Sequence, residues 1–223
     1  MITITDLRFQ YSGSDFALQV EQLVIAAAQS VAIVGPSGSG KTTLLNLLAG
    51  VLLPDRGQVR VGNEIVSALN DNARRNFRIR QMGMVFQNFE LLEYLSVLDN
   101  ILLPLRIGSG LEATGELRSR AVELAGHVGI GDKLKRYPNQ LSQGERQRVA
   151  VSRALLLQPA LVLADEPTGN LDPSNKTVVL DLLLDYARTH SATLITVTHD
   201  QELLPRFDRV VDFRVLNQWE PTV

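Results

Sequence analysis

The feature that most constrains the fold is a glycine-rich run early in the chain, Gly35-Pro36-Ser37-Gly38-Ser39-Gly40-Lys41-Thr42, which matches the pattern G-x-x-x-x-G-K-[ST] in full. An apolar segment at residues 30–34 precedes the run, and an apolar helical pattern beginning at Thr43 follows it. This order of strand, loop and helix is the context that a phosphate-binding loop requires. Glycines let successive backbone N–H groups converge on a phosphate, Lys41 adds a positive charge, and Thr42 offers a hydroxyl to Mg²⁺. The run therefore predicts an α/β fold with a P-loop nucleotide-binding core.

Other apolar patterns predict the rest of the architecture. Three later segments are apolar without alternation: residues 84–86, 161–164 and 194–197. Such segments are typical of a mostly parallel sheet with helices on both faces. Residues 2–34 read as strands, with alternation through Val20 and a buried run at 31–34, and an N-terminal antiparallel β-subdomain is expected. After residue 88 the apolar spacing becomes helical, with Ser96 as a candidate N-cap, so an inserted helical subdomain is expected.

The composition supports one compact domain and excludes several functions. The chain has 223 residues and 45% hydrophobic content, enough for one α/β domain or for a core with an inserted lobe. A formal net charge of −2 gives no basic footprint, so no nucleic-acid partner is expected. The sequence has no cysteine, which excludes disulfides and thiolate metal sites. We expect no secretion signal, no membrane span and no regulatory domain after residue 219, so a membrane role would need another chain.

Polar side chains follow the predicted parallel strands at the points where the strands end. Gln87 follows the first of them, Asp165 and Glu166 follow the second, and His199 follows the third. The carboxyl ends of parallel strands gather ligands at one edge of a sheet, so Asp165 is expected to hold Mg²⁺ through its water shell. Glu166 is the natural base. An isolated Asp-Glu pair is more often a solvated turn, and a histidine at a strand end is often only a satisfied polar residue, but the upstream P-loop favours the functional interpretation.

A second phosphate-directed element begins at Ser142. In the run Leu141-Ser142-Gln143-Gly144-Glu145, a small polar residue and a glycine open a predicted helix and leave backbone N–H groups free at its positive end. The chain already has one phosphate loop. We therefore infer that the second element serves a nucleotide held by another molecule.

These motifs, together with Asp165-Glu166-Pro167-Thr168-Gly169-Asn170-Leu171-Asp172, are similar to those of the ATP-binding subunit of an ABC transporter, and the resemblance covers essentially the whole chain. The resemblance implies a single ABC ATPase domain over residues 1–223. Its core and β-subdomain would occupy residues 1–87 and 141–223, and its helical subdomain residues 88–140. It also implies a head-to-tail dimer in which two copies of the chain clamp two ATP molecules, with ATP and Mg²⁺ as cofactors.

The resemblance also implies a role for each candidate residue. ATP binding is assigned to the phosphate run and its neighbour: Gly35, Pro36, Ser37, Gly38, Ser39, Gly40, Lys41, Thr42 and Thr43. Mg²⁺ binding is assigned to Thr42, Gln87 and Asp165, and catalysis to Glu166, His199, Gln87 and Lys41. Tyr11 is expected to stack on adenine, with Phe9 as the fallback and core packing as the alternative. Across the dimer, the residues expected to meet the second copy and its nucleotide are Ser142, Gly144 and Asp172.

The run at Ser142 departs from the family's commonest form, Leu-Ser-Gly-Gly-Gln, at Gln143 and Glu145. With Glu145 present, the run is also a capping box, in which Ser142 and Glu145 each accept a hydrogen bond from the other's backbone N–H. The carboxylate stabilises the helix but repels an incoming phosphate. On dimerisation we expect Ser142 and the Gly144 N–H to turn to the partner's ATP. Glu145 is then expected to swing toward one of two arginines, Arg146 or Arg148.

Within the family, the segments 85–92, 100–105 and 164–172 look most like the lipoprotein-releasing, macrolide-exporting and cell-division ABC ATPases. This implies a peripheral ATPase on the cytoplasmic face of the inner (plasma) membrane, with an integral membrane subunit docked near residues 88–105. One alternative is a soluble ABC ATPase that acts on ribosomes or DNA, although such proteins usually carry two cassettes or a long coiled-coil insertion. A P-loop kinase or GTPase is a third class, but neither needs the Ser142 element. Residues 208–217 resemble the family's closing strands.

Overall fold

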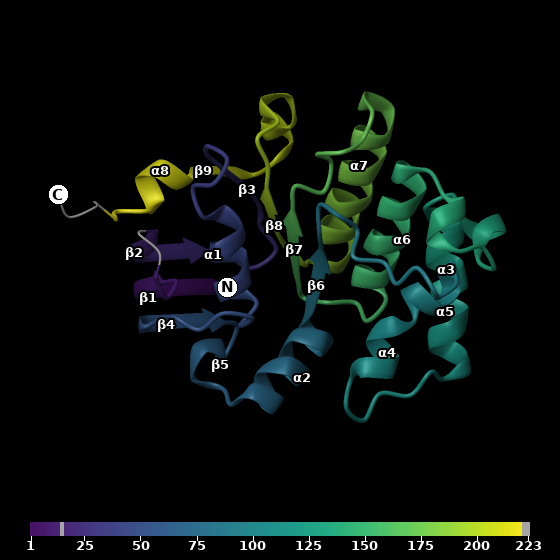
Figure 1. Ribbon diagram of the computed structural model, residues 1–223, viewed down its shortest axis with the longest axis horizontal. Coiled ribbons are helices and arrows are strands. Elements are labelled where there is room, and N and C mark those ends of the chain that lie inside the picture. The colour runs from purple at the N-terminus through teal and green to yellow at the C-terminus, as the bar shows by residue number, and fades with distance from the viewer. Residues whose placement is uncertain (14–15, 220–223) are drawn as a thin grey trace.

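A computed structural model describes residues 1–13 and 16–219 of the chain, and its strands form two sheets (Figure 1). The first sheet is antiparallel, in the order β2-β1-β4-β5, and consists of β1 (Ile2–Gln10), β2 (Ala17–Ile25), β4 (Arg56–Val61) and β5 (Glu64–Ile65). The second is parallel, in the order β6-β7-β8-β3-β9, and consists of β3 (Ser30–Val34), β6 (Met82–Val85), β7 (Leu161–Asp165), β8 (Thr193–Val197) and β9 (Arg209–Asp212). The three later apolar segments are therefore parallel strands, as predicted, whereas residues 30–34 join them in the parallel sheet instead of the antiparallel one.

Helices connect and cover these strands. Within the described residues the α-helices are α1 (Lys41–Leu48), α2 (Asp71–Gln81), α3 (Val97–Ile101), α4 (Leu103–Ile107), α5 (Gly115–His127), α6 (Gln143–Leu155), α7 (Pro173–His190) and α8 (Phe213–Leu216). Short 3₁₀ helices are η1 (Val66–Ala68), η2 (Gly131–Lys133), η3 (Pro138–Gln140) and η4 (Gln201–Arg206). None of the helices in the described ranges combines the length and apolar content that a bilayer crossing requires.

The parallel sheet is covered on both faces because its side chains alternate between two cores. In β3, Val31 and Ile33 pack in a core that includes α1 and the antiparallel sheet, whereas Ala32 packs in a core built with α6 and α7. The same alternation runs through β7 and β8. The predicted fold class, a P-loop core with an antiparallel β-subdomain and added helices, is confirmed.

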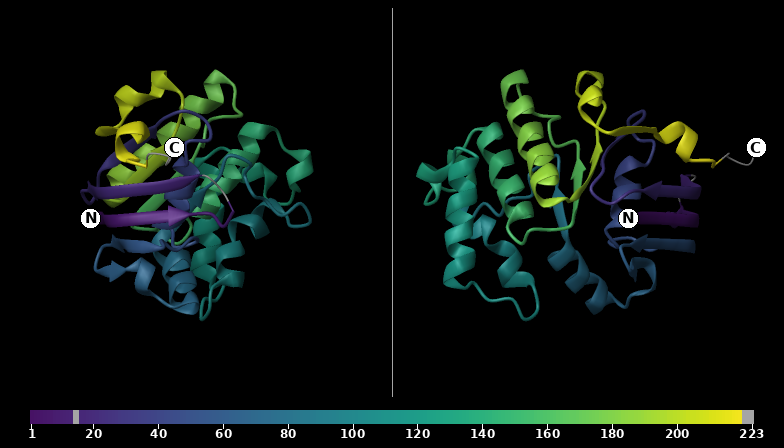
Figure 2. Two further views of the ribbon diagram at one scale, coloured as in Figure 1. Left: turned by 60° about the vertical axis from the view of Figure 1, so that its left-hand side comes forward. Right: turned by 180° about the vertical axis from the view of Figure 1, so that it is seen from behind.

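Helices α3, α4 and α5 form a layer beside α6, on its side away from the parallel sheet (Figures 1 and 2). Ile101 of α3 and Ala121 of α5 share a third core with Val149 of α6. The predicted cap of α3 is confirmed, since Ser96 Oγ accepts a hydrogen bond of 3.1 Å from the Asp99 N–H. Side chains of α6 belong both to this core and to the core under the parallel sheet, so the packing does not separate the helical layer from the rest of the chain. The subdomain boundaries at residues 88 and 140 stay a prediction.

The closing segment, residues 208–217, differs from the closing strands that the resemblance implied. Only β9 forms, and the chain then turns into the short helix α8. The turn has a local cause, because the Asp212 side chain accepts a 2.9 Å hydrogen bond from the Arg214 N–H and so caps the helix, while Phe213 is buried. Residues 220–223 lie outside the described part of the chain.

Candidate nucleotide site

The phosphate loop joins β3 to α1 and takes the backbone shape that its glycines allow. Gly38 and Gly40 have positive φ angles of 76° and 103°, a region that other residues rarely adopt. Position 40 is also crowded, because a Cβ added there would lie 2.3 Å from the Phe16 ring. The buried Lys41 Nζ donates to the carbonyl oxygens of Gly35 at 2.9 Å and Pro36 at 2.7 Å. The Lys41 side chain thus folds back onto its own loop and bridges two of the loop's carbonyl oxygens.

One buried polar atom of the loop fits a phosphate. Ser39 Oγ is buried and has no hydrogen-bond partner among the described residues, although the Ser39 N–H bonds to Pro36 O at 3.3 Å. A buried hydroxyl without a partner is costly, so its presence inside a glycine-rich loop favours a bound anion. The donors of this loop therefore fit the phosphates of a nucleotide.

An aromatic wall lies next to the loop and bounds a hollow of about 310 Å³. The lining residues are Tyr11, Phe16, Gly38, Gly40, Lys41, Thr42 and Thr43. Tyr11 is 41% exposed, and its hydroxyl lies 3.2 Å from Thr43 Oγ1, so core packing does not describe it. Its ring meets Phe9 edge-on, with centroids 4.8 Å apart, and Phe9 itself is buried. The structure therefore places Tyr11, rather than the fallback Phe9, beside the loop.

Phe16 is a wall residue that the sequence did not reveal. It lies 6.1 Å from Tyr11 between ring centroids and packs on Gly40. No local pattern marks it, because it precedes β2 in a loop and meets the phosphate loop only through the fold. The sequence shows only an aromatic residue five positions after Tyr11, which does not place it at the loop.

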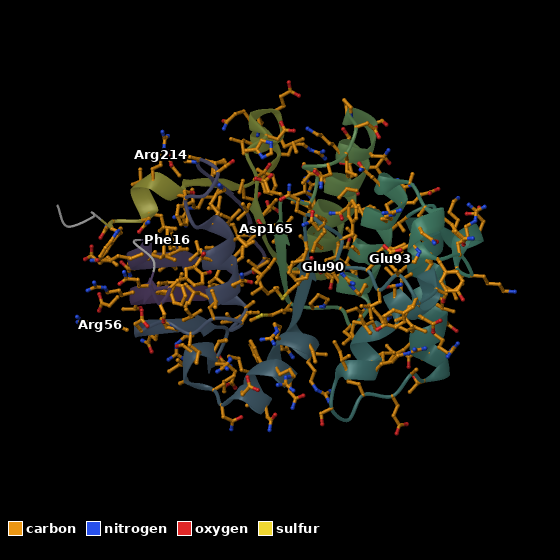
Figure 3. All side chains as sticks on the ribbon, viewed as in Figure 1. Phe16, Arg56, Glu90, Glu93, Asp165 and Arg214 are labelled. Atoms are coloured by element: carbon orange, nitrogen blue, oxygen red, sulfur yellow. The ribbon has the colours of Figure 1, made fainter. Side chains whose placement is uncertain are left out.

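Asp165 and Glu166 lie where β7 ends, and Asp165 is near the centre of the molecule (Figure 3). Burial raises the pKa of Asp165 above its ordinary value, while a hydrogen bond from Thr42 opposes that shift. The positive charge of Lys41 also acts to lower this pKa. The hydroxyl of Thr42 and the carboxylate of Asp165 are thus brought together, as the predicted metal site requires.

Glu166 is held in an unusual conformation beside β8. Its φ angle is 46°, in the left-handed region, and its N–H donates to Val197 O at 3.0 Å. His199 Nδ1 lies 2.8 Å from Glu166 Oε2, but the two atoms do not meet the angle of a hydrogen bond, and Oε2 is buried without such a partner among the described residues. Strained backbone and unpaired polar atoms cluster at functional sites. Glu166 and His199 are therefore held against each other at the carboxyl ends of β7 and β8.

Gln87 is exposed after β6 and lies beside the segment that follows Glu166. The Gln87 Nε2 is 3.4 Å from the place where a Cβ on Gly169 would lie, and the Gln87 backbone carbonyl oxygen accepts a hydrogen bond from Asn170 Nδ2 at 3.5 Å. A small cavity of about 100 Å³ between β6 and β7 is lined by Thr42 and Asp165 among others. Gln87, Asp165, Glu166 and His199 therefore meet at one edge of the parallel sheet, as predicted.

The donor set at this edge fits Mg²⁺ rather than a protein-only metal site. No cluster of three or more His, Cys, Asp or Glu side chains suited to a metal occurs among the described residues. Mg²⁺ needs no such cluster, because it keeps several waters and is usually held by one or two carboxylates together with substrate phosphates. The hydroxyl of Thr42 and the carboxylate of Asp165 match that requirement.

Ser142 begins α6 with the predicted capping box. The Ser142 N–H donates to Glu145 Oε2 at 2.7 Å, and the Glu145 N–H donates to Ser142 Oγ at 3.3 Å. The bond from the Ser142 N–H is the main cause that holds the pKa of Glu145 below its usual value. Lys133 of η2 lies 3.4 Å from Glu145 Oε1 and was not predicted as its partner. The two predicted arginine partners bond elsewhere, Arg146 to Pro138 O and Arg148 to Asn175 Oδ1.

Asp172 caps α7 and is linked to the start of α6. Its carboxylate accepts from Ser174 Oγ at 2.5 Å and from the Asn175 side chain at 2.7 Å, and these bonds hold the pKa of Asp172 well below its usual value. Asn175 Oδ1 accepts from Arg148 at 2.6 Å, and a Cβ on Gly144 would lie 2.4 Å from that oxygen. Ser142, Gly144 and Asp172 thus form a second cluster. Within the described part of the chain, no residue of α6 lines the hollow beside the phosphate loop.

The fold and the phosphate loop define a P-loop nucleoside triphosphatase. The sequence profile of the ABC transporter family matches residues 18–169 of the chain. The chain belongs to this family and is an ATP-binding ATPase subunit, so the predicted membership is confirmed.

Individual relatives agree with the family assignment. The lipoprotein-releasing system ATP-binding protein LolD of Pseudomonas fluorescens is 45% identical over 190 residues, which cover 85% of this chain and 83% of LolD. The macrolide export ATP-binding/permease protein MacB of Rhodopirellula baltica is 44% identical over 95% of this chain, which spans 31% of MacB. The dimeric, ADP- and Pi-bound structure of the ATP-binding cassette MJ0796 matches with a TM-score of 0.86 and 32% identity, covering 95% of this chain and 94% of that one.

Proposed function

We propose that this chain is the ATP-hydrolysing subunit of a transporter of the LolD or MacB kind, and that it acts as a head-to-tail homodimer. In this dimer each ATP would lie between the phosphate loop of one copy and Ser142 and Gly144 of the other. The observation that supports it is the separation of the phosphate-directed residues into two clusters, with no residue of α6 on the hollow beside the phosphate loop among the described residues. The dimeric MJ0796 cassette, similar over nearly the whole chain, agrees with this arrangement.

The residues of the first cluster would divide the hydrolytic work. Lys41 would exchange its carbonyl partners for phosphate oxygens, and Ser39 would donate to the same phosphates. Glu166 would orient the attacking water and accept its proton, and His199 Nδ1, 2.8 Å from Glu166 Oε2, would hold that carboxylate in place. Tyr11 would stack on adenine at the mouth of the hollow.

Mg²⁺ would complete this site, and Thr42, Asp165 and Gln87 would hold it. When bound, it neutralises charge on the transferring phosphoryl group. Asp165 is suited to this task because its buried carboxylate is under-compensated by the protein alone.

A groove between the sheet and the helical layer would receive the membrane subunit. It has a volume of about 250 Å³ and is mostly apolar, with walls from α2, β6, α4 and α6. Glu90, Leu103 and Pro104 fall within the predicted docking range 88–105, and Ile107 extends it. We therefore propose a peripheral location on the cytoplasmic face of the inner membrane, with residues 88–140 acting as the helical lobe that receives the partner.

Size-exclusion chromatography of the Glu166→Gln variant tests the proposed dimer. The variant should bind ATP and hydrolyse it at least about a hundredfold more slowly than the wild type, because the base is lost. It should therefore elute as a dimer with ATP and as a monomer without it. The control is Glu123→Gln, an exposed change on α5, which should hydrolyse ATP like the wild type. A Glu166→Gln protein that binds ATP and stays monomeric would contradict the proposal.

The membrane partner is tested separately by purifying the chain from native membranes and identifying its companion. A four-span protein with a large extracytoplasmic domain would support the LolD or MacB kind. A companion with many spans, as in an importer, would overturn that assignment.

A further inference from the structure

Arg153 of α6 holds the turn that follows Gln87. The residue is 9% exposed, and its guanidinium donates to two consecutive backbone carbonyls, that of Phe89 at 2.7 Å and that of Glu90. In Figure 3, Glu90 lies in view between Asp165 and Glu93, at the junction of the sheet and the helical layer. The contact therefore ties the helix that begins at Ser142 to the loop that carries Gln87.

The turn that Arg153 holds is strained. Phe89 and Glu90 have φ angles of 64° and 49°, both in the left-handed region that favours glycine. The Phe89 N–H bonds to Phe86 O at 3.2 Å and the Glu90 N–H bonds to Asn88 O at 2.7 Å, so the chain reverses tightly just after Gln87. Two adjacent residues in this region need support from outside the turn. The forked guanidinium supplies it by binding both carbonyls at once.

A buried cation at this place carries a desolvation cost. Burial lowers the pKa of Arg153 to about 10, with the nearby charge of Glu90 acting in the opposite direction. No carboxylate within the described ranges forms an ion pair with it, so backbone carbonyls are its partners. A well-packed apolar side chain often serves a buried position as well as a charge does. We therefore look for the role of Arg153 in its two hydrogen bonds to the turn and not in the apolar contacts of its side chain.

We propose that Arg153 is a positioning residue for ATP hydrolysis that acts through Gln87. The inference rests on the proposed function, in which Gln87 reaches Mg²⁺. By fixing the turn at residues 88–90, Arg153 keeps the Gln87 side chain next to Gly169 and on the side of Asp165 and Glu166. Without the fork, the turn relaxes toward ordinary backbone angles and Gln87 leaves that place.

Arg153→Met, with an unbranched apolar side chain, tests the role of the fork in the full-length chain. Its affinity for a fluorescent ATP analogue should stay within about twofold of the wild type, because the phosphate loop is untouched, whereas kcat should fall about ten- to a hundredfold, as expected for a misplaced group. Arg153→Lys should recover part of the loss. Arg80→Met is the matched control, because Arg80 also donates to a loop carbonyl, that of Ser109 at 2.9 Å, and its kcat should be unchanged. An unchanged kcat in a folded Arg153→Met protein overturns the proposal.

A double-mutant cycle separates positioning from general destabilisation. In a Gln87→Ala background, Arg153→Met should lower kcat less than about twofold, since the residue through which it acts is gone. Equal losses in both backgrounds would overturn the proposal. If Arg153→Met does not fold, the same cycle with Arg153→Lys decides the question by the same criterion. If the cycle is additive and the wild type hydrolyses ATP and dimerises, only the proposed role of Arg153 is contradicted. If the wild type does neither, the proposed function itself is contradicted.

Discussion

The carboxylate of Asp165 lowers the stability of the nucleotide-free protein, and its position suits the binding of the nucleotide's Mg²⁺. It is partly buried at the end of β7, and burial is the main cause that raises its pKa. The Thr42 hydrogen bond and the Lys41 charge compensate only in part. A carboxylate with a raised pKa is less stable in the folded chain than in the unfolded chain, so the charged form costs stability.

Replacing Asp165 by Asn should therefore stabilise the nucleotide-free protein. The expected gain is about 0.5–2 kcal/mol in the free energy of unfolding at neutral pH, the usual range where a functional site opposes stability. The gain should shrink as the pH falls through the raised folded pKa, because the wild-type carboxyl then becomes neutral as well. Urea unfolding at several pH values measures this. The same variant should lose Mg²⁺-dependent hydrolysis, and a loss of stability at neutral pH would contradict the account of Asp165.

Single residues also show what could be read from the sequence. The phosphate loop, Asp165 and Glu166 could be predicted because each motif is contiguous and carries its own chemistry. Phe16 could not, because it reaches Gly40 only through the fold. Arg153 left one signal, since it falls four residues after Val149 and three before Leu156 on an apolar helix stripe. A cation on such a stripe indicates a buried partner, but the sequence does not say which one.

At the scale of elements, α6 connects three functional segments. Ser142 begins it with a capping box, Arg148 reaches Asn175 beside Asp172, and Arg153 reaches the turn after Gln87. Gln147 adds a buried link, because its Nε2 donates to Pro167 O at 2.6 Å, directly after Glu166. The sequence predicted the helix and its cap, but these links depend on which loops pack against it.

Glu145 should weaken ATP-dependent dimerisation, because its carboxylate lies on the first turn of α6 where a phosphate is proposed to bind. Glu145→Gln keeps a capping-box residue and removes the charge. We expect the dimer of the Glu166→Gln background to form at a protein concentration lower by about three- to thirtyfold, from a helix-terminus effect of about 0.3–1 kcal/mol at each of its two ATP sites. Analytical ultracentrifugation with ATP measures the shift.

The matched control for Glu145 is Glu116→Gln, which removes an exposed carboxylate from the first turn of α5. It should leave the dimerisation midpoint unchanged. Weaker dimerisation in Glu145→Gln would show that the capping box supports the interface instead of competing with it.

At the scale of the whole molecule, hydrogen bonds connect the first residue of β3 to the residue before β9, the last strand among the described residues. Asp208, just before β9, accepts from the Ser30 N–H at 2.8 Å and from Ser30 Oγ at 2.7 Å, across 178 residues of chain. These bonds hold the pKa of Asp208 below its ordinary value of 3.8. The sequence indicated a closing strand here but not this bond, and it did not show that α8 replaces a second strand.

Asp208→Asn should destabilise the protein at neutral pH by about 1 kcal/mol, the difference between charged and neutral hydrogen bonds. A depressed folded pKa contributes stability above the unfolded value and loses it as the pH falls through the folded pKa. The difference between variant and wild type should therefore begin to shrink as the pH falls to 3.8 and vanish only below the lower folded pKa, as measured by urea unfolding. Asp185→Asn, an exposed change on α7, is the control and should have little effect. A cost that is independent of pH, or equal after Ser30→Ala, would contradict this tie.

The crowding between α6 and α7 also limits which substitutions the start of α6 can accept. A Cβ on Gly144 would collide with Asn175, whereas Gln143, one position earlier, is exposed. The two neighbouring glycines of the family's commonest form therefore differ in how much room they have. The first corresponds to position 143, where a side chain fits and this chain has glutamine. At the second, a Cβ would displace the Asn175 side chain and disturb its bonds to Asp172 and Arg148, so the packing limit falls on one position of the motif and not on the other.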